Sequence, residues 1–436
     1  MTTLTFPLSR IEGHARVEIE VQDGEVLSAH FQATEWRGFQ YLVQGAPAEQ
    51  MPVIVPRICG VCSTAHHVAS VKALEDAYGI EPPPLARTIR ELLLLGQLIQ
   101  NQATSLFIFT MPDRLGVDSL FEVDEADADA AEAHVEMRAL QIRQAGTHLI
   151  RLAGGQFIHP VKATVGGVTG GIPAQEAEKM RESLAQVLPS ARELFDYYWE
   201  KSLALGERLG TWGDDAPACY IASVGSECPN FCGEQLHVLN AEGSYCTSFA
   251  TQNFRDYLIH QESETSYAGQ TSFQGEVLRA NSLARINLVE RLGTPVADAY
   301  LARFREAFGN PAHAILLFDL ARGIELVYAL ERAQEILAQP LDGEEVAVSY
   351  TRRDGEGYGL VEAPRGPLIH HYRIEDGRIA EAEFIIPTVH NILAIERALR
   401  VAARRYITAE RVDMELERAV GRVVRAFDPC IACATH

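Results

Sequence analysis

Two cysteine pairs, each with two intervening residues, lie near opposite ends of the chain. Cys59 and Cys62 belong to the segment RICGVC, and Cys430 and Cys433 precede a histidine three residues further on. Four thiolates that converge can bind one soft or borderline metal ion, such as zinc, nickel or iron. Spacing alone therefore indicates a shared metal site, with structural zinc as the ordinary interpretation. A thioredoxin-like dithiol is less favoured, because neither pair lies in a βαβ pattern.

The composition limits the class of protein. The chain has 436 residues, of which 47% are hydrophobic, so it can bury a large core. Its net charge of −21 disfavours nucleic acid and anionic membranes as partners. We find no signal-peptide pattern and no apolar run long enough to span a bilayer. We therefore expect a cytoplasmic protein without a transmembrane segment.

Most of the chain has helical periodicity. A helix is expected after Cys62 with a glycine stop, and a long apolar helix from about Leu85 to Phe109. Further helices are expected at 125–153, at 175–209 with an interruption at Pro189, at 312–337 and at 409–425.

Strands are expected in two places. Residues 15–33 alternate around Asp23-Gly24 as a hairpin does, and the region 345–387 is β-rich with a hairpin at Asp376-Gly377. Residues 154–173 are rich in glycine. We expect one domain over residues 1–436, mainly α, with a large helical bundle and small β elements. Each cysteine motif should begin or end a helix near its centre.

The residues flanking the cysteines are more specific than their spacing. The motif R-x-C-G-x-C with His66 four residues on, and the motif D-P-C-x-x-C-x-x-H that ends at His436, resemble the large, catalytic subunit of nickel–iron hydrogenases. The segments SRIEGH (9–14), GG…HP (154–160), EAPRG (362–366) and IPTxxN (386–391) are similar to further motifs of that family. The resemblance runs the length of the chain and is strongest to the soluble cytosolic branch.

The resemblance implies a fold, an activity and a cofactor. The activity is the reversible heterolytic cleavage of H2 to protons and electrons, at a nickel–iron centre whose iron carries carbon monoxide and cyanide. Cys59 and Cys430 would be terminal nickel ligands, while Cys62 and Cys433 would bridge nickel to iron. This chain has no ferredoxin-like cysteine run. An iron–sulfur small subunit is therefore implied as partner, together with a maturation endopeptidase and nickel-insertion proteins.

The resemblance also assigns roles to charged residues. Glu12 would accept the proton from a terminal cysteine; otherwise it is a surface carboxylate at the edge of a hairpin. Arg365 would lie above the open side of the metal centre and donate hydrogen bonds to a cyanide, a role that suits the several N–H donors of a guanidinium. Otherwise Arg365 belongs to an ion pair in the core. Asp428 would pair with Arg365.

Four further residues complete the implied site. Thr388 would hydrogen-bond the second cyanide, and Pro364 would shape a dry pocket, with Pro387 in the same motif as Thr388. His66 lies one helical turn beyond Cys62 and would donate to that bridging sulfur. Otherwise His66 is a capping or core histidine.

Two departures from the family pattern concern ions and protons. Gln40 stands where many relatives carry a glutamate that helps to bind a magnesium or iron ion beside the C-terminal histidine. An amide oxygen can still ligate a hard cation, but without charge, so an Mg or Fe ion near Gln40 and His436 is left open. The long helix reads QNQATS at 100–105, where the family often has histidines.

The C-terminus is a processing site in this family. Relatives are often made with an extension that is removed just after such a histidine, so we expect the sequence to be the mature form with His436 buried.

Other functions share part of this pattern. A low-turnover hydrogen sensor would share every ligand, whereas a zinc-stabilised interaction subunit would share only the cysteines. Relatives that act on quinone lack the full set of four. Four more thiols are expected to be free, since no C-x-x-C occurs among them: Cys219, Cys228, Cys232 and Cys246. The electron acceptor, the direction of catalysis, oxygen tolerance and subunit number are not encoded in these motifs.

Overall fold

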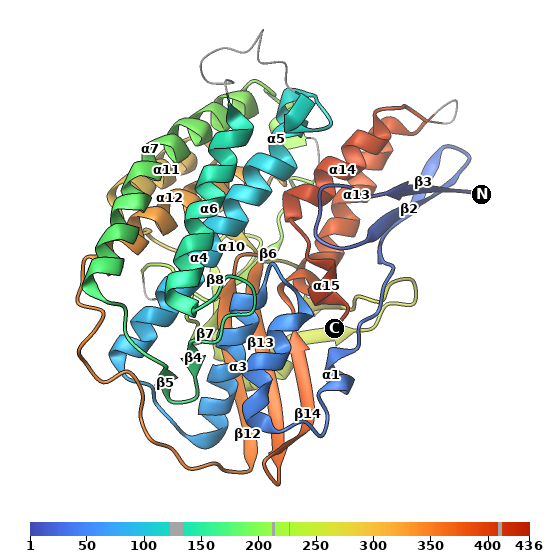
Figure 1. Ribbon diagram of the computed structural model, residues 1–436. Coiled ribbons are helices and arrows are strands. Elements are labelled where there is room, and N and C mark those ends of the chain that lie inside the picture. Colours follow the sequence, from blue (N-terminus) through green and yellow to red (C-terminus); the bar gives the residue numbers. More distant parts are fainter. Residues whose placement is uncertain (123–133, 212–213, 226, 409–411) are drawn as a thin grey trace.

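The computed structural model describes residues 1–122, 134–211, 214–225, 227–408 and 412–436. Most of the long helices form a bundle on one side of the molecule, and a three-stranded sheet with its covering helix lies below them (Figure 1). The long helices are α3 (Ser63–Tyr78), α4 (Pro84–Ala103), α6 (Val135–Gly154), α7 (Ala174–Leu203), α11 (Pro295–Phe308), α12 (Leu317–Leu337), α13 (Ile392–Tyr406) and α14 (Leu416–Phe427).

Short helices connect these elements. They are α1 (Phe39–Leu42), α2 (Met51–Ile54), α5 (Met111–Leu115), α8 (Arg208–Thr211), α9 (Phe254–Tyr257), α10 (Ser282–Leu288) and α15 (Ile431–Ala434). Single turns are η1 (Ala48–Gln50), η2 (Val55–Ile58), η4 (Leu120–Glu122), η5 (Thr251–Asn253) and η6 (Pro387–Asn391), and η3 (Thr104–Thr110) is a π-helix.

The long apolar helix runs through the centre of the bundle. Helix α4 continues through η3 into α5, so the expected helix is present with a π-helical segment near its end. Among the described residues, the stretch Pro84–Leu115 is long and apolar enough to cross a membrane, but 83% of its apolar window is buried inside the protein. It therefore packs as a core helix.

The N-terminal sheet contains the expected hairpin. Strands β2 (Ala15–Gln22) and β3 (Glu25–Ala33) pair around Asp23-Gly24, and β1 (Thr2–Pro7), which was not expected from the sequence, adds a third antiparallel strand. Burial alternates along β2, which explains the period-two pattern.

A second sheet packs against α3. Strands β12 (Gly355–Ala363), β13 (Gly366–Glu375) and β14 (Arg378–Ile385) pair in that order, and β13 and β14 meet at the predicted Asp376-Gly377 turn. Helix α3 packs directly on β12 because glycines face it. A Cβ at Gly359 would lie 1.9 Å from the carbonyl oxygen of Ala69.

The largest sheet was not expected from the sequence. Six short strands are ordered β8-β7-β6-β11-β10-β9. They are β6 (Cys219–Ala222), β7 (Gln235–Leu239), β8 (Tyr245–Ala250), β9 (Leu258–Gln261), β10 (Gln270–Phe273) and β11 (Glu276–Arg279); β4 (Ala163–Thr164) and β5 (Gly167–Val168) form a small pair in the glycine-rich region. The fold is thus a helical bundle with more strand than the sequence indicated.

The helix boundaries include one correction and two predicted starts that fall partly outside the described residues. Helix α7 is continuous through Pro189, so the predicted interruption is wrong. Buried Ala191, Leu194 and Phe195 hold the C-terminal half in place, and such packing outweighs the lost backbone hydrogen bond. Helices α6 and α14 begin at Val135 and Leu416, while the predicted starts include 125–133 and 409–411, which lie outside the described residues.

Candidate metal centre

The four cysteines of the two motifs meet in the core. Cys62 directly precedes α3, and Cys430 directly precedes α15. The sulfur atoms of Cys59 and Cys430 are 3.4 Å apart, and all four sulfurs lie within 4.8 Å of one another. No other cluster of three or more such histidine, cysteine or carboxylate ligands occurs among the described residues. Four buried, unpaired thiols at this separation fit a single soft metal site.

The protonation of the four thiols is uneven. Burial raises the pKa of Cys430 and Cys433 well above the ordinary thiol value. Hydrogen bonds from these two thiols, together with the positive charge of Arg365, lower the pKa of Cys62. The Nη1 of Arg365 donates to the Cys62 sulfur at 3.3 Å. The protein therefore provides a cation beside the thiolate cluster, which favours the deprotonated, metal-binding form.

Glu12 contacts this cluster from the loop between β1 and β2. Its Oε2 accepts hydrogen bonds from the Cys430 thiol at 3.0 Å and from the backbone N–H of Ala432 at 3.1 Å. Gly13 has φ of +82°, and a Cβ there would lie 2.7 Å from the Cβ of Ile431. A glycine is thus needed for the loop to reach α15. Burial, and secondarily the charge of Cys59, raises the pKa of the Glu12 carboxyl.

Arg365 and Asp428 form a buried ion pair above the sulfurs. Arg365 lies in the turn between β12 and β13, and its Nη2 donates to Oδ1 of Asp428 at 3.0 Å. Its Nε donates to the backbone carbonyl of Asp428 at 2.5 Å. Asp428 ends α14 in the left-handed conformation, with φ of 49°. The guanidinium is thereby held in one orientation, with one nitrogen on Cys62.

Three more predicted residues line the same region. Pro364 precedes Arg365, and its carbonyl accepts a hydrogen bond from Arg285 at 2.8 Å. Pro387 begins the turn η6, and the Thr388 hydroxyl oxygen accepts a hydrogen bond from the backbone N–H of Cys430 at 3.0 Å. All three are buried. The Thr388 hydroxyl is the acceptor in that contact, so its proton is not used there.

His66 contacts a different sulfur from the one expected. Its Nε2 lies 3.4 Å from the sulfur of Cys433, so the predicted contact with Cys62 is wrong. The reason is that Cys62 faces Arg365, whereas the His66 ring extends from the first turn of α3 toward α15. The other ring nitrogen lies 2.9 Å from His370, whose ring is hydrogen-bonded to Tyr372.

Gln40 and His436 lie beside one cavity, of about 700 Å³. The His436 ring is hydrogen-bonded to the carbonyl of Cys433 at 2.9 Å and packs edge-on against Phe384. His436 is partly buried and its ring is held by these contacts, so the prediction that it is buried is met only in part, because the ring faces this cavity. The described residues offer no preformed group of three acidic or histidine ligands there.

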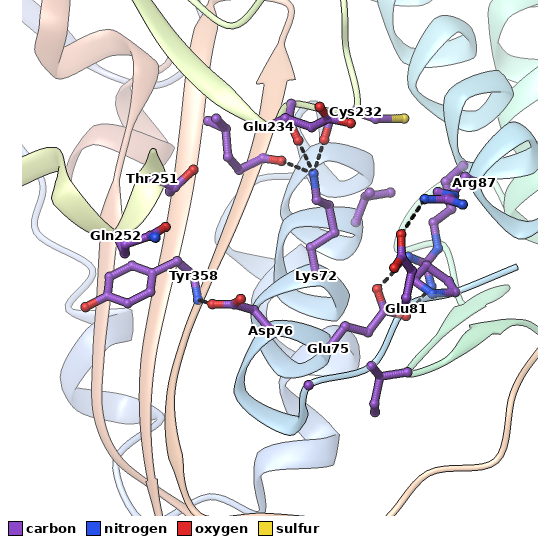
Figure 2. A pocket seen from close by; sticks show the side chains of 17 residues that line it. Lys72, Glu75, Asp76, Glu81, Arg87, Cys232, Glu234, Thr251, Gln252 and Tyr358 are labelled. Carbon is purple, nitrogen blue, oxygen red and sulfur yellow. Dashed lines mark hydrogen bonds and ion pairs between the residues drawn. The ribbon is translucent and has the colours of Figure 1, made fainter. Parts of the chain in front are cut away.

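A second cavity, of about 460 Å³, lies along α3 (Figure 2). There the ammonium of Lys72 donates to the backbone carbonyls of Cys232, Gly233 and Leu360. Its three donors are all used, so Lys72 fastens α3 to β12 and the loop before β7. Burial lowers the pKa of Lys72 to about 8.

The remaining cysteines do not join the cluster. Cys219 is buried, Cys228 and Cys232 are partly buried, and Cys246 is exposed, and all four are free. Burial raises the pKa of Cys219 and of Cys232 to about 11, so these two are protonated thiols.

Sequence reasoning missed some residues that support the site. Asn101 donates to Oδ2 of Asp428 at 3.1 Å, and Gln97 donates to the carbonyl of Val61 at 3.1 Å. Both lie on α4 and are buried. Polar amides inside an otherwise apolar helix were the available signal, because a buried amide requires a partner.

Known proteins share both the fold and these motifs. Residues 37–137 and 238–436 match the nickel-dependent hydrogenase family, and residues 5–36 match a family described as HoxL-like. The chain is 34% identical to a subunit of the vhu F420-non-reducing hydrogenase of Methanococcus voltae, over 91% of this chain and 97% of that protein. It is 29% identical to the beta subunit of the NAD-reducing hydrogenase HoxS of Cupriavidus necator, over 99% and 93%.

A solved structure agrees with these relatives. The crystal structure of an NAD+-reducing NiFe hydrogenase in the H2-reduced state superimposes with a TM-score of 0.90 at 28% identity, over 100% of both chains. The fold, the four-cysteine cluster and the family match together show that this chain belongs to the nickel-dependent hydrogenase family, as a large subunit similar to those of soluble-type enzymes.

Proposed function

We propose that this chain is the subunit that cleaves H2 reversibly and passes the electrons to an iron–sulfur partner. The observation that carries the proposal is the cluster of four sulfurs within 4.8 Å of one another, with a carboxylate 3.0 Å from one of them. Cys59, Cys62, Cys430 and Cys433 would hold nickel and an iron carrying carbon monoxide and cyanide. When bound, that centre supplies the open metal position at which H2 is split.

The chain's own groups can move the proton that cleavage releases. The Cys430 thiolate would accept it first, because a thiolate bound to the metal can serve as a base and this sulfur lies 3.0 Å from the Glu12 carboxylate. The Glu12 carboxylate is within hydrogen-bond distance and takes the proton next. Glu12 is only partly buried, so it links the buried thiols to the N-terminal loop.

Arg365 and Thr388 would act on the diatomic ligands of the iron. The guanidinium of Arg365 donates hydrogen bonds to both the side chain and the backbone carbonyl of Asp428. A donor that is already fixed in this way does not have to reorient during the reaction. The Thr388 hydroxyl has its proton available beside Cys430. The buried prolines 364 and 387 exclude water from the same face.

Electrons would leave where the first cysteine motif reaches the surface. Gly60, between Cys59 and Cys62, is exposed. Val53, Ile158 and Val161 are exposed apolar residues on the adjoining segments, which are joined by a hydrogen bond between His159 and the carbonyl of Pro56. An apolar surface next to the thiolates suits a docked iron–sulfur partner. One relative, from Archaeoglobus profundus, is itself named as an iron-sulfur component of an F420-non-reducing hydrogenase.

Assembly and location follow from the same proposal. Nickel-insertion proteins and an endopeptidase would act before α15 closes over the cluster, and a cytoplasmic location suits free thiols. Because Gln40 and His436 face one cavity, an Mg or Fe ion between them belongs to the proposal as well; the uncharged amide would bind it more weakly than a carboxylate.

Infrared spectroscopy and metal analysis of the purified complex test this function. We expect nickel, iron and bands of metal-bound carbon monoxide and cyanide, and we expect Cys62→Ser to lose all three with H2 oxidation. Cys219→Ser is the matched control, since that thiol is buried but lies outside the cluster. Zinc as the only metal would instead support the zinc-stabilised interaction protein, and full activity of Cys62→Ser would refute the ligand assignment.

A further inference from the structure

Asn281 has a backbone conformation that asparagine rarely adopts. Its φ is 90° and its ψ is −172°, a region that glycine occupies readily and other residues avoid. The residue is completely buried. Such a conformation persists only where the surrounding contacts require it, so the role of the side chain must outweigh the backbone strain.

The Asn281 side chain makes two contacts in opposite directions. Its Oδ1 accepts a hydrogen bond from the backbone N–H of Ser282 at 2.6 Å, at the start of α10. Its Nδ2 donates to the backbone carbonyl of Phe427 at 2.8 Å. Phe427 is the last residue of α14 and directly precedes Asp428. Glycine would relieve the backbone but could make neither contact.

The peptide at Asn281 also adjoins the other segments of the metal centre. The N–H of Ala280 donates to Oδ1 of Asn391, in the turn that contains Thr388. A Cβ at Gly366 would lie 2.7 Å from the Cβ of Ala280 and 3.3 Å from the nitrogen of Asn281. The two buried residues Ala280 and Asn281 therefore touch the segments that carry Arg365, Thr388 and Asp428.

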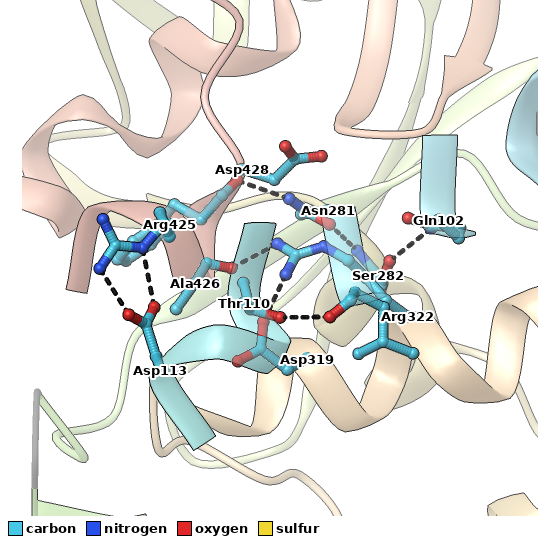
Figure 3. A network of polar contacts seen from close by, with 12 residues as sticks. Gln102, Thr110, Asp113, Asn281, Ser282, Asp319, Arg322, Arg425, Ala426 and Asp428 are labelled. Carbon is cyan, nitrogen blue, oxygen red and sulfur yellow. Dashed lines mark hydrogen bonds and ion pairs between the residues drawn. The ribbon is translucent and has the colours of Figure 1, made fainter. Parts of the chain in front are cut away.

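The end of α14 is held by three side chains from three different segments, of which Figure 3 shows Asn281 and Arg322. Arg322 donates to the carbonyl of Ala426, Asn281 to that of Phe427, and Arg365 to that of Asp428. These carbonyls have no partner within the helix, so each needs a donor from outside it. The arrangement fixes the backbone two residues before Cys430.

We propose that Asn281 is a positioning residue of this hydrogenase, which sets the place of Asp428, and through it of Arg365 and Cys430, by donating a hydrogen bond to the Phe427 carbonyl. The inference rests on the proposed function, since it concerns residues assigned to the nickel–iron centre. It adds a residue that touches neither the metals nor a cysteine.

Asn281→Asp separates the two contacts of the side chain. A carboxylate still accepts from the Ser282 N–H and so keeps the helix cap, but it cannot donate to the Phe427 carbonyl and repels it. Asn281→Gly removes both contacts while it relieves the backbone, so it tests the same point if the aspartate variant does not assemble.

Asn287→Asp is a matched control on the same helix. Asn287 is buried, donates to the carbonyl of Ala312 at 2.9 Å and accepts from its N–H at 3.0 Å. The substitution therefore removes one amide donor from a buried carbonyl, but that carbonyl lies in the loop before α12 and not beside Cys430.

The test measures infrared bands, nickel content and turnover of the purified holoenzymes. We expect Asn281→Asp and Asn281→Gly to retain nickel, to shift or broaden the carbon monoxide and cyanide bands, and to lose turnover by about 10²-fold, as a small displacement of catalytic groups does. Asn287→Asp should keep native bands and turnover. Native bands and turnover in both Asn281 variants, or an equal loss in Asn287→Asp, would overturn the inference. Absence of the bands from the unsubstituted holoenzyme would refute the proposed function instead.

Discussion

Replacement of Glu12 by glutamine separates the role of this side chain in proton transfer from its role in the hydrogen bonds of the site. The Oε2 of Glu12 accepts from the Cys430 thiol at 3.0 Å and from the Ala432 N–H at 3.1 Å. A glutamine can place its carbonyl oxygen at the same position and keep both contacts. It cannot, however, take up and release a proton. Since burial already raises the pKa of this carboxyl, loss of the negative charge should change the stability little.

The expected loss follows from the role of a positioned acid–base group. Such a group contributes about 10²–10⁴-fold to a rate. At 1.36 kcal/mol for each factor of ten, this corresponds to about 3–5 kcal/mol of the activation barrier. We therefore expect Glu12→Gln to reduce H2 oxidation and hydrogen–deuterium exchange by at least about 10²-fold.

The assay compares dye-coupled H2 oxidation, isotope exchange and infrared bands in the same preparation. Glu20→Gln is the control, because Glu20 lies on the adjoining strand β2, where its carboxylate accepts a hydrogen bond from the Ser28 hydroxyl at 2.7 Å. The native bands should persist in both variants. Isotope exchange at the native rate in Glu12→Gln would refute the role of Glu12 and move the proton exit elsewhere.

Three further predictions concern the guanidinium, the C-terminus and pH. Arg365→Lys should assemble the centre but turn over about 10²-fold more slowly, because an ammonium cannot span Asp428 and Cys62 as a fork does; an unchanged rate would make Arg365 structural. A short uncleavable tail after His436 should keep Cys430 and Cys433 from closing over the metals, so the product should be inactive and should not dock the iron–sulfur partner; an active complex with the tail would contradict this. Burial raises the pKa of the Glu362 carboxyl from 4.5 to about 7, so this group is protonated in the folded state at pH values where it is ionised in the unfolded chain. The free energy of unfolding should therefore fall as pH rises from 4.5 to about 7. Glu362→Gln should reduce this pH dependence in thermal unfolding, and an unchanged pH dependence would contradict the assignment.

The sequence predicted the parts of the fold that have strong local signals. The hairpin at Asp23-Gly24, the glycine end of α3 and the strands after residue 355 all combine clear periodicity with a turn residue. The six-stranded sheet was missed because its strands are only four to six residues long, too short for a period to be recognised. Its pairing also joins β6 in parallel to the distant β11, which no local pattern encodes.

The site was predicted in part for a similar reason. The cysteines, Glu12 and Arg365 belong to contiguous motifs and were identified by them. The contact of His66 with Cys433 depends on how α3 and α15 face each other, which a motif does not contain. Asn281 has no motif at all; its signal is a backbone angle that exists only in three dimensions.

The four-sulfur cluster also has a topological effect. Cys59 and Cys430 are 371 residues apart, so a metal held by both closes almost the whole chain into a ring. By loop-closure entropy, a ring of this size costs about 2 kcal/mol more to close than one of about 40 residues. The metal thus acts as a cross-link that restricts the unfolded chain, and its removal should release the N-terminal loop and α15 together, as one unit in hydrogen exchange.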